Sequence, residues 1–597
     1  MFTMEREVYQ RFMANLEKWN ERYDPEVKMI RRPFHSPGYH TTLKGGYTHP
    51  TRDSLTYAVA LLDSRTEEYR SRAEEIIEKL LSLQDTDPAN KTYGIWSWFY
   101  EEPLEKMSPP DWNWADFCGK ELLQVALDHS DRISPELYDK VKAGIYHASQ
   151  SIIRRNMGPG YTNIAIMGTY VTLVAGQVLQ DKEIWDYGKK RLKRIYEYTQ
   201  YHGAFTEYNS PTYTVVALED ISRLYQHVKD AECRKMIKEL NRIGWKCLAS
   251  HFHPTTRQWA GPHSRCYASL QGNQFLSRIQ IATEGKVHFL SDEKLESDIQ
   301  WPRISLRCPF EFFPYFTDIR QERDIREVFF KGSGDQKPQA ATSYLTPEYT
   351  LGSFHRSEMW NQRRALIGYF GDYRHPVCMH LRFLHDGYDY SSAYLHCVQS
   401  KNSLLGIVNF STDGGDTHIG LDKIQNATIQ VSDLRLRLEF TGSVDLLDCP
   451  EEWKEDHTIR SKIKNTCIDL CIPECSFGDS RIDYQVNREK NTIGIDVVLY
   501  QGTKKAVNFN ELGEAVCVLA MQIHSAAQKT TPFPVNIAKA GKEKMGEGGN
   551  NGIGGDCIHA VWDSGNGDVL SIHAHRKPQT SKTLAESTGA INGVPVC

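Results

Sequence analysis

The stretch HGAFTEYNSPTY at residues 202–213 interrupts a first half of the chain that otherwise has helical periodicity. Helix interiors rarely contain Gly and Pro together with so many polar and aromatic side chains. Ser210-Pro211 predicts a turn, and Tyr213 is expected to begin the next helix. We therefore interpret this stretch as the rim of a cleft between two helices.

Two further interruptions of the same kind lie on either side of it, GPGYTN at residues 158–163 and WAGPHSR at residues 259–265. If the three breaks meet in space, one site receives the amide of Asn163, the phenol of Tyr213, the guanidinium of Arg265 and an imidazole. This set of groups suits the abstraction of a proton next to a carboxylate.

Apolar residues recur at three- and four-residue spacing through most of the first 300 residues, which predicts amphipathic helices. The pattern is clearest at residues 55–62, 73–81, 119–129, 136–156, 164–179, 183–199, 213–228 and 230–252. Helices that come in pairs indicate an α/α toroid of helical hairpins over residues 1–300, incomplete or closed. No regular sequence repeat is visible, so a solenoid is disfavoured.

The periodicity changes from about residue 340, where short apolar or alternating runs predict β-strands. These runs lie at residues 364–370, 403–410, 427–431, 434–440, 493–500, 515–521 and 569–574. No convincing helices separate them, so we predict a large antiparallel β-sandwich over residues 341–597 rather than an α/β sheet. The Pro-containing stretch 301–340 is interpreted as the interdomain connection, and the Gly-rich stretch 541–555 as a mobile loop.

The composition fits a globular protein of more than one domain. The chain has 597 residues, 40% of them hydrophobic, and a net charge of −5. Two or more domains are expected at this length, and the absence of a long Lys/Arg run argues against a nucleic-acid partner. No apolar stretch has the length of a membrane span. The N-terminal residues from Met1 lack the basic start and apolar run of a secretory signal, which favours the cytoplasm.

Fourteen cysteines are then expected to stay reduced. Cys467, Cys471 and Cys475 follow one another at equal spacing, but they lack the paired CxxC and His partners of a zinc site. We interpret them as buried structural thiols on one face of a strand.

The order of parts and two short motifs resemble the toroid-plus-β-sandwich polysaccharide lyases, including heparinase II/III-like and alginate-lyase-like enzymes. In that group, the resemblance implies, an Asn-His pair begins one helix and a Tyr follows on a Ser-Pro-x-Tyr turn. Here Asn163 and Tyr213 match these positions, but Ile164 stands where the relatives have His. Because Ile cannot transfer a proton, either another residue is the base or one tyrosine both removes and returns the proton.

The resemblance implies β-elimination next to a uronate carboxylate, whose developing negative charge must be neutralised. Asn163 and Arg265 are the expected neutralising groups, and Tyr213 is the expected acid, with Tyr208 as a second candidate. His263 is a candidate base, unless a tyrosine with a cationic neighbour serves instead. The structural alternatives are a helix cap for Asn163, a salt bridge for Arg265, half-buried packing for the tyrosines and a structural role for His263.

Two aromatic stretches, residues 96–100 and 111–114, bracket Pro109-Pro110 and are too broken for one helix. They present four tryptophans that either stack on sugar rings or fill an interhelical core. These are Trp96, Trp98, Trp112 and Trp114. His40, in the polar and Gly-rich stretch 34–49, is expected to line one end of a substrate.

In the second half, residues 352–364 are rich in polar contact groups. In the resembled lyases a sandwich loop closes over the toroid cleft and contributes a His or an Arg. His355 is therefore a candidate catalytic residue, and Arg356, Trp360 and Asn361 are candidate binding residues. The alternative is an interdomain seam.

The sequence thus predicts a lyase for a uronate-containing oligosaccharide or polysaccharide, acting on chain ends or on oligosaccharides. One alternative is an inverting glycoside hydrolase, for which Glu207, Asp111, Asp116 and Glu219 are available carboxylates. Another is a glycan-binding protein without catalysis. The elimination requires no metal or other cofactor, because Asn and Arg can replace a cation. The sequence leaves open whether the protein binds a structural divalent ion. No nucleic acid or membrane is expected as a partner, and the sequence does not indicate the oligomeric state.

Overall fold

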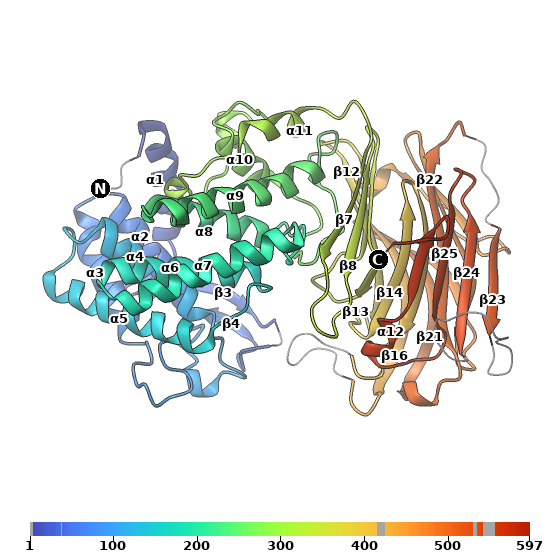
Figure 1. The fold of residues 1–597 in the computed structure, drawn as a ribbon, viewed down its shortest axis with the longest axis horizontal. Coiled ribbons are helices and arrows are strands. Elements are labelled where there is room, and N and C mark those ends of the chain that lie inside the picture. Colours follow the sequence, from blue (N-terminus) through green and yellow to red (C-terminus); the bar gives the residue numbers. More distant parts are fainter. Residues whose placement is uncertain (1–3, 38, 415–423, 529–533, 541–555, 597) are drawn as a thin grey trace. The chain divides into compact units, whose positions relative to one another are not determined.

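The computed structural model describes residues 4–37, 39–414, 424–528, 534–540 and 556–596 (Figure 1). The chain divides into two compact units. The first consists of Met1–Glu207, Tyr213–Lys246 and Gly272–Phe313, and the second of Tyr208–Thr212, Cys247–Gln271 and Pro314–Cys597. Helices make up the first unit and strands most of the second, which confirms the predicted order of a helical region followed by antiparallel sheets. No helix among the described residues has the length and apolar character needed to cross a membrane.

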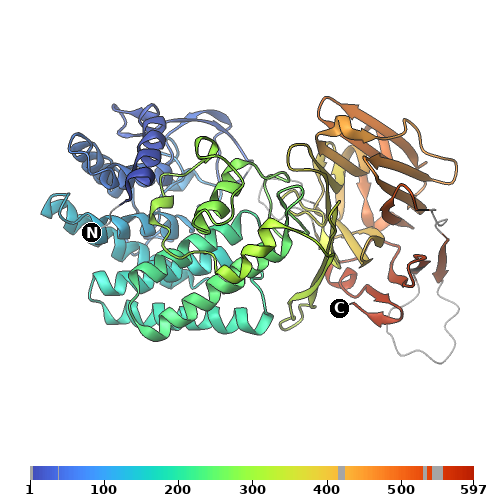
Figure 2. The same cartoon turned by 90° about the horizontal axis from the view of Figure 1, so that it is seen from above.

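The helices of the first unit follow one another in pairs, as predicted (Figures 1 and 2). After α1 (Arg6–Asn20) come α2 (Thr51–Asp63) and α3 (Glu68–Leu81), α4 (Trp114–Asp128) and α5 (Pro135–Arg155), α6 (Thr162–Val178) and α7 (Lys182–His202), α8 (Tyr213–His227) and α9 (Ala231–His251), and then α10 (Asn273–Ala282). The short helix α11 (Phe313–Thr317) belongs to the second unit except for its first residue. Every helical pattern of the sequence therefore corresponds to a helix.

The odd and even members of these pairs form different layers. Helices α2, α4, α6 and α8 pack against one another in succession, and α2, α4 and α6 are buried over almost their whole length. Helices α3, α5 and α7 bury only one face. Because each outer helix runs back along its partner, the inner helices run in one direction and begin at the same end. This is the arrangement of an incomplete α/α toroid.

The interruption at residues 202–213 has the predicted form. Helix α7 begins at a cap in which the Asp181 carboxylate accepts from the Ile184 N–H (3.0 Å). It ends at His202, and Gly203 follows with a φ of +83°, a conformation that glycine adopts without a steric penalty. Helix α8 begins at Tyr213, as expected from the preceding Ser-Pro turn.

Arg303 closes the opposite end of the inner layer. Its guanidinium donates to Asp63 (2.9 Å) at the end of α2 and to Asp128 (2.5 Å) at the end of α4, and it is 2% exposed. A buried cation at helix C-termini is stabilised by the helix dipoles as well as by the carboxylates.

The described part of the second unit contains three large antiparallel sheets and the two-stranded pair of β5 (Phe252–His253) and β6 (Gln258–Trp259). The nine-stranded sheet has the order β20 (Asp483–Glu489), β21 (Thr492–Asn508), β16 (Thr428–Gly442), β12 (Pro376–His385), β11 (Leu366–Gly371), β9 (Thr350–Phe354), β8 (Gln339–Leu345) and β7 (Arg323–Phe330), with β13 (Tyr388–Asp389) beside β12. The seven-stranded sheet has the order β10 (Arg356–Glu358), β14 (Ala393–Ser400), β15 (Ser403–Phe410), β22 (Ala515–Ser525), β19 (Thr466–Phe477), β18 (Thr458–Ile463) and β17 (Leu447–Asp448). The five-stranded sheet has the order β23 (Val535–Ala540), β24 (Cys557–Asp563), β25 (Val569–His575), β26 (Thr588–Ile591) and β27 (Val594–Pro595).

The seven-stranded sheet is the middle of three layers. Along β15, Leu404 and Val408 belong to the core shared with the nine-stranded sheet, whereas Leu405 and Ile407 belong to the core shared with the five-stranded sheet. The predicted antiparallel sandwich is therefore confirmed, and a third sheet covers its outer face.

Several predicted segments take a more detailed form. The runs 427–431 and 434–440 belong to one long strand, β16, which carries register shifts where it pairs with β21. The predicted connection 301–340 contains α11 and β7. The predicted loop 541–555 lies outside the described residues.

The three evenly spaced cysteines all lie on β19. Cys467 and Cys471 are buried and Cys475 is half-buried. A register shift between Cys471 and Glu474 interrupts the alternation of faces, so equal spacing does not by itself put the three thiols on one face.

Candidate functional site

The N-terminal ends of the inner helices carry a row of polar and aromatic side chains. Thr51 begins α2, Trp114 begins α4, Thr162 begins α6 and Tyr213 begins α8. The Trp114 Nε1 donates to the Thr51 Oγ1 (2.9 Å), which joins the first two helix starts. Since the four helices run in one direction, these starts share one end of the first unit, and we define this end as the candidate site.

Trp98, Trp114 and His40 form an aromatic wall in this site. The rings of Trp98 and Trp114 stack with centroids 5.2 Å apart and an interplanar angle of 29°, and the His40 ring lies 5.2 Å from that of Trp98. The His40 Nδ1 donates to the Pro109 carbonyl (2.8 Å), which fixes the orientation of the imidazole. All three wall residues are half-buried, so part of each side chain faces solvent.

The other two tryptophans do not join this wall. Trp96 is 1% exposed within the helical core, and its Nε1 donates to the Leu80 carbonyl (2.7 Å). A sugar cannot stack on a ring whose faces are covered, so the predicted binding role of Trp96 is wrong. Trp112 packs against the edge of the same core and donates to the Lys91 carbonyl (3.0 Å).

Asn163 and Glu207 form a buried pair at the start of α6. The backbone N–H of Asn163 (2.8 Å) and its Nδ2 (2.7 Å) both donate to the Glu207 Oε2. Thr206, next to Glu207, donates to the Gly160 carbonyl (3.1 Å), so two of the predicted breaks meet here. The helix start does favour an anion, as expected, but that anion is a carboxylate of the protein itself.

The expected role of Asn163 as a ligand of a substrate carboxylate is therefore corrected. Asn163 is 1% exposed, and its amide is engaged with Glu207. In this arrangement it positions the start of α6 and the segment 203–212, made of bends and turns, that leads towards Tyr213. Tyr213 itself is half-buried at the first position of α8.

Two arginines that the sequence did not indicate lie at the same end. Arg155, at the end of α5, donates to the Asn113 Oδ1 (2.6 Å), and the Asn113 Nδ2 lies 3.4 Å from the Tyr161 hydroxyl. The Arg52 guanidinium lies 5.6 Å from the centroid of the Trp114 ring. A single arginine near a helix end has no sequence signature, because such residues are common on helix surfaces.

The carboxylates considered for a hydrolase are paired or sealed. Asp111 accepts from the Trp98 Nε1 (3.1 Å), and Glu219 pairs with Arg278 (2.9 Å). Asp116 is 2% exposed, and burial raises the pKa of its carboxyl to about 7. Together with the bound Glu207, these contacts provide no pair of carboxylates that faces a common space.

In the second unit, Tyr208 is a packing residue. Its hydroxyl donates to the Glu327 carboxylate (2.6 Å), its ring stacks on Phe329 with centroids 4.5 Å apart, and it is 1% exposed. Burial and the neighbouring Glu327 charge hold the pKa of its phenol well above the usual value. An acid or base in elimination needs the opposite shift and an exposed hydroxyl, so Tyr208 is not a second candidate acid.

His263 is also sealed inside the second unit. Its Nδ1 donates to the Asn209 carbonyl (2.6 Å), it is 0% exposed, and burial lowers the pKa of its imidazole to about 3. The expected role as a general base is therefore corrected to a structural one. Ser210 donates to the Arg265 carbonyl (2.7 Å), which brings the predicted breaks at residues 202–213 and 259–265 together within this unit.

Arg265 lies in a polar cluster with part of the predicted segment 352–364. Its Nε donates to the Gln362 Oε1 (2.9 Å), and its guanidinium lies 5.0 Å from the centroid of the Trp360 ring. Asn361 donates from its Nδ2 to the Tyr388 hydroxyl (2.6 Å). The sequence thus identified residues that do come together, although they do so in the second unit.

His355 and Arg356 are engaged within the sandwich. The His355 Nδ1 donates to the Cys397 carbonyl (2.9 Å), and burial lowers the pKa of the imidazole to about 4. Arg356 donates to the carbonyls of Ala585 (2.6 Å) and Pro338 (3.0 Å). These contacts bind both side chains to the backbone of the second unit, so the expected catalytic role of His355 and the binding role of Arg356 are corrected.

Comparison with protein families and with curated proteins gives no functional name. Residues 11–287 match a family model described as a domain of unknown function, DUF8769. No curated protein matches the chain in sequence.

Solved structures similar to the chain include members of both groups that the sequence resembles. A heparinase III, the BT4657 gene product, is 9% identical over 96% of this chain and 91% of its own, with a TM-score of 0.35. A heparan sulfate lyase HepC mutant from Pedobacter heparinus is 9% identical over 93% and 92%, with a TM-score of 0.39. Alginate lyase A1-III complexed with a tetrasaccharide is 12% identical over 51% and 94%, with a TM-score of 0.24. At these identities and TM-scores the likeness carries no information about the reaction.

Proposed function

We propose that the protein is a polysaccharide lyase that cleaves a glycosidic bond to a uronic acid by β-elimination. The observation that supports this proposal is the position of Tyr213 at the start of inner helix α8, beside the start of α6 and at the same end as the aromatic wall. Trp98 and Trp114 offer rings on which a sugar can stack. The resemblance of the sequence points to the same class of reaction.

In this reaction a base removes the proton on C5 of the uronate. The electron pair of the C–H bond forms the C4–C5 double bond, the C4–O bond breaks, and the departing oxygen takes up a proton. Negative charge develops on the carboxylate at C6 as the proton leaves, and cationic hydrogen-bond donors must stabilise it. Within the first unit, Arg52 and Arg155 are the guanidinium groups that we assign to this task. Arg265, assigned to this task from the sequence, lies in the second unit.

Tyr213 is the group that we assign to both proton transfers. Ile164, at the position of the family's His, is 1% exposed in α6, and His263 is sealed in the second unit. The deprotonated phenol takes the C5 proton and then returns it to the departing oxygen. A single group can reach both atoms only when they lie on the same face of the sugar ring.

This requirement selects the substrate. In glucuronate and mannuronate, the hydrogen on C5 and the oxygen on C4 lie on the same face of the ring, whereas in iduronate and guluronate they lie on opposite faces. We therefore propose glucuronate or mannuronate as the sugar that is cleaved. Action on oligosaccharides or chain ends is part of the proposal.

The test is incubation with oligosaccharides rich in each of the four uronates, followed by ultraviolet absorbance of the unsaturated product and by product sizing. Product is expected from glucuronate or mannuronate glycans, and Tyr213→Phe should lower kcat by about 100-fold or more with little change in thermal unfolding. Tyr146→Phe, on the 41% exposed tyrosine of α5, is the matched control and should keep full activity.

Three outcomes would contradict the proposal. Reducing ends without ultraviolet absorbance would indicate hydrolysis, and binding without any product would indicate a glycan-binding protein. Full activity of Tyr213→Phe would remove Tyr213 from the mechanism. Release of single unsaturated sugars from chain ends, rather than a ladder of products, is the result expected of chain-end action.

A further inference from the structure

The side chain of Asn113 departs from the role that its position predicts. Asn113 directly precedes α4, where an asparagine side chain ordinarily accepts a hydrogen bond from an N–H of the first helical turn. Here the side chain makes no such bond. Its Oδ1 accepts from the Arg155 Nη1 (2.6 Å), and its Nδ2 lies 3.4 Å from the Tyr161 hydroxyl. Helix α4 therefore forgoes a cap, and the amide holds a guanidinium at the end of the unit that carries the candidate site.

Asp111 joins Asn113 to the aromatic wall. One of its carboxylate oxygens accepts from the Asn113 N–H (3.0 Å), which closes a turn of the kind that aspartate favours. The other oxygen accepts from the Trp98 Nε1 (3.1 Å), and Trp98 stacks on Trp114, the residue after Asn113. Asp111 is 7% exposed, so water competes little for these two bonds. One buried carboxylate thus fixes both a ring of the wall and the residue that holds Arg155.

Arg155 is anchored by one of its donors only, among the residues that the structure describes. It is half-buried at the end of α5, where the helix dipole favours a cation. Within the described ranges its guanidinium makes one hydrogen bond, the one to Asn113, and no carboxylate lies within 4.0 Å of it. An arginine side chain has five N–H donors in one plane, and the amide that accepts from this one is uncharged. The contact with Asn113 therefore orients the guanidinium and leaves its charge without a partner at short range.

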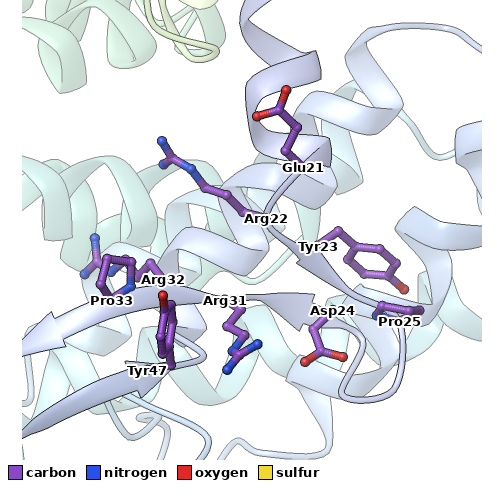
Figure 3. Close-up of a pocket in the computed structure, with 9 residues that line it drawn as sticks. All are labelled: Glu21, Arg22, Tyr23, Asp24, Pro25, Arg31, Arg32, Pro33 and Tyr47. Carbon is purple, nitrogen blue, oxygen red and sulfur yellow. The ribbon is translucent and has the colours of Figure 1, made fainter.

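Arg52, the other guanidinium beside the wall, is already paired. Its Nε lies 3.3 Å from the Asp53 carboxylate, which also pairs with Arg32 (2.8 Å). Arg32 lies on β3 (Arg32–His35), at the edge of the pocket that Figure 3 shows. A carboxylate at the Nε edge of Arg52 occupies a position that a sugar acid would need for a contact with two hydrogen bonds. Arg155 has no such competitor.

We propose that Arg155 binds the carboxylate of a uronate that stacks on Trp98 and Trp114, and that Asp111 and Asn113 are positioning residues that set the guanidinium against the rings. Stacking recognises the apolar face of any sugar, whereas a planar guanidinium recognises a carboxylate with two parallel hydrogen bonds. Because Asp111 fixes the two together, the arrangement selects acidic sugars over neutral sugars of the same shape. The proposal deepens the proposed function and rests on its acidic substrate.

The change Asn113→Asp separates this role from a purely structural one. The aspartate keeps an acceptor for the Arg155 N–H and adds a negative charge that the start of α4 favours, so a structural contact would become stronger. In our proposal the same carboxylate neutralises Arg155 and competes with the sugar acid. The temperature of thermal unfolding should therefore not fall, while the binding of an acidic sugar weakens.

The experiment is calorimetric titration of the full chain, made inactive with Tyr213→Phe, with two pairs of tetrasaccharides. Each pair shares its linkage and ring configuration and differs in the carboxylates: tetraglucuronate with cellotetraose, and tetramannuronate with mannotetraose. Asn113→Asp and Arg155→Gln are each expected to raise the Kd of the acidic probes about tenfold or more and to leave the neutral probes within about twofold. Lys182→Gln is the matched control. It makes the same change of net charge at the start of α7, at the opposite end of the unit, on a side chain that is 85% exposed, and it should leave all four Kd values within about twofold.

Each outcome bears on the proposal. A loss confined to the acidic probes supports it, and the double variant Asn113→Asp/Arg155→Gln should then lose little more than either single variant. Equal losses with acidic and neutral probes would mean that the changes disturb the wall, and unchanged Kd values would mean that Arg155 does not bind the sugar acid. Either result overturns the proposal, as does a parent protein that binds neither acidic probe. If Asn113→Asp does not fold, Arg155→Gln alone decides.

The proposed function can fail separately. A protein with Tyr213 intact that binds the acidic probes but forms no unsaturated product from any glycan contradicts the lyase. The contact of Arg155 with the sugar acid is then still judged on binding alone.

Discussion

Replacing Asn163 with alanine is expected to destabilise the first unit by about 2 kcal/mol, because a hydrogen bond to a charged group contributes roughly 1.5–3 kcal/mol. The Asn163 Nδ2 lies 2.7 Å from the Glu207 Oε2, and the two residues are 1% and 8% exposed, so water does not replace the lost donor. The loss should not be larger, because the backbone N–H at 2.8 Å remains bonded. Glu207→Gln removes the charge from the same pair and from the α6 dipole, and a similar loss of about 2 kcal/mol is expected.

The assay is a double-mutant cycle that compares the protein with the two single variants and with the double variant. Unfolding is followed by calorimetry. Because the two side chains bond to each other, the double variant should lose little more than either single variant, with a coupling energy of about 1–2 kcal/mol. Asn90→Ala is the matched control. It removes an amide–carboxylate bond (Asn90 Nδ2 to Asp85, 3.1 Å) at the exposed surface, and it should cost less than about 0.5 kcal/mol.

The reasoning fails if Asn163→Ala is no more destabilising than Asn90→Ala. It also fails if the two single losses add in the double variant, since additivity means that the two side chains do not depend on each other. Either result would free the Asn163 amide for the substrate contact that the sequence suggested.

Three further predictions follow from buried charged and titratable groups. The pKa values of His263 (about 3) and His355 (about 4) lie below the ordinary imidazole value, so the unfolded chain takes up protons that the folded chain does not. The free energy of unfolding of the second unit should therefore fall as the pH drops from about 6.5 to 4, by up to about 3 kcal/mol for each imidazole; a pH-independent unfolding transition would contradict this. The pKa of Asp116, about 7, is shifted upwards instead, so the folded state keeps a proton that the unfolded state releases. The free energy of unfolding should fall as the pH rises from about 4 to 7, and Asp116→Asn should flatten this dependence and stabilise the first unit at pH 8 by up to about 4 kcal/mol; equal pH profiles for the two proteins would be incompatible with the assignment. Arg303→Met should destabilise the first unit by about 3–5 kcal/mol, because the buried Asp63 and the half-buried Asp128 lose their cation, whereas Arg307→Met at the surface should change stability by less than about 0.5 kcal/mol. Calorimetry of the two variants checks this prediction. Equally small effects of both changes would show that the contacts of Arg303 with Asp63 and Asp128 do not stabilise the first unit.

Most helices of the first unit were predictable because their apolar residues follow a clear helical spacing. The inner helices are apolar nearly all around, and the outer ones carry a broad apolar stripe, so both kinds stand out from loops. Helix α1 was not predicted. Only Phe12 and Leu16 are buried on it, which makes its stripe too narrow to distinguish from a polar segment.

The third sheet of the second unit could not be predicted from the strands that contact it. Residues 515–521 are apolar at every position, because alternate side chains of β22 enter two different cores. Such a run shows that both faces are buried, but it does not say what covers each face. The five-stranded sheet is built from segments near the C-terminal end of the chain, and only β25 gave a strand signal there.

The candidate site was predicted in part for a related reason. Residue type and spacing identified Trp98, Trp114 and His40, which form one wall, and Tyr213, which begins α8. The same criteria also selected His263, because they do not register burial. Whether an imidazole or a phenol is accessible depends on contacts with segments far away in the sequence, which the motif itself does not contain.

The polar richness of residues 202–213 illustrates this difference. Glu207 binds the start of α6 through Asn163. Asn209 donates to the Ala260 and Pro262 carbonyls (2.8 and 2.9 Å) and accepts from the Trp259 Nε1 (2.5 Å). These side chains satisfy buried polar groups of the two units, as a chain that leaves one unit for the other requires. The many polar side chains of this stretch are therefore explained by the passage of the chain from one unit to the other. The assignment of chemistry to Tyr213 rests on a different observation, its half-buried position at the start of α8.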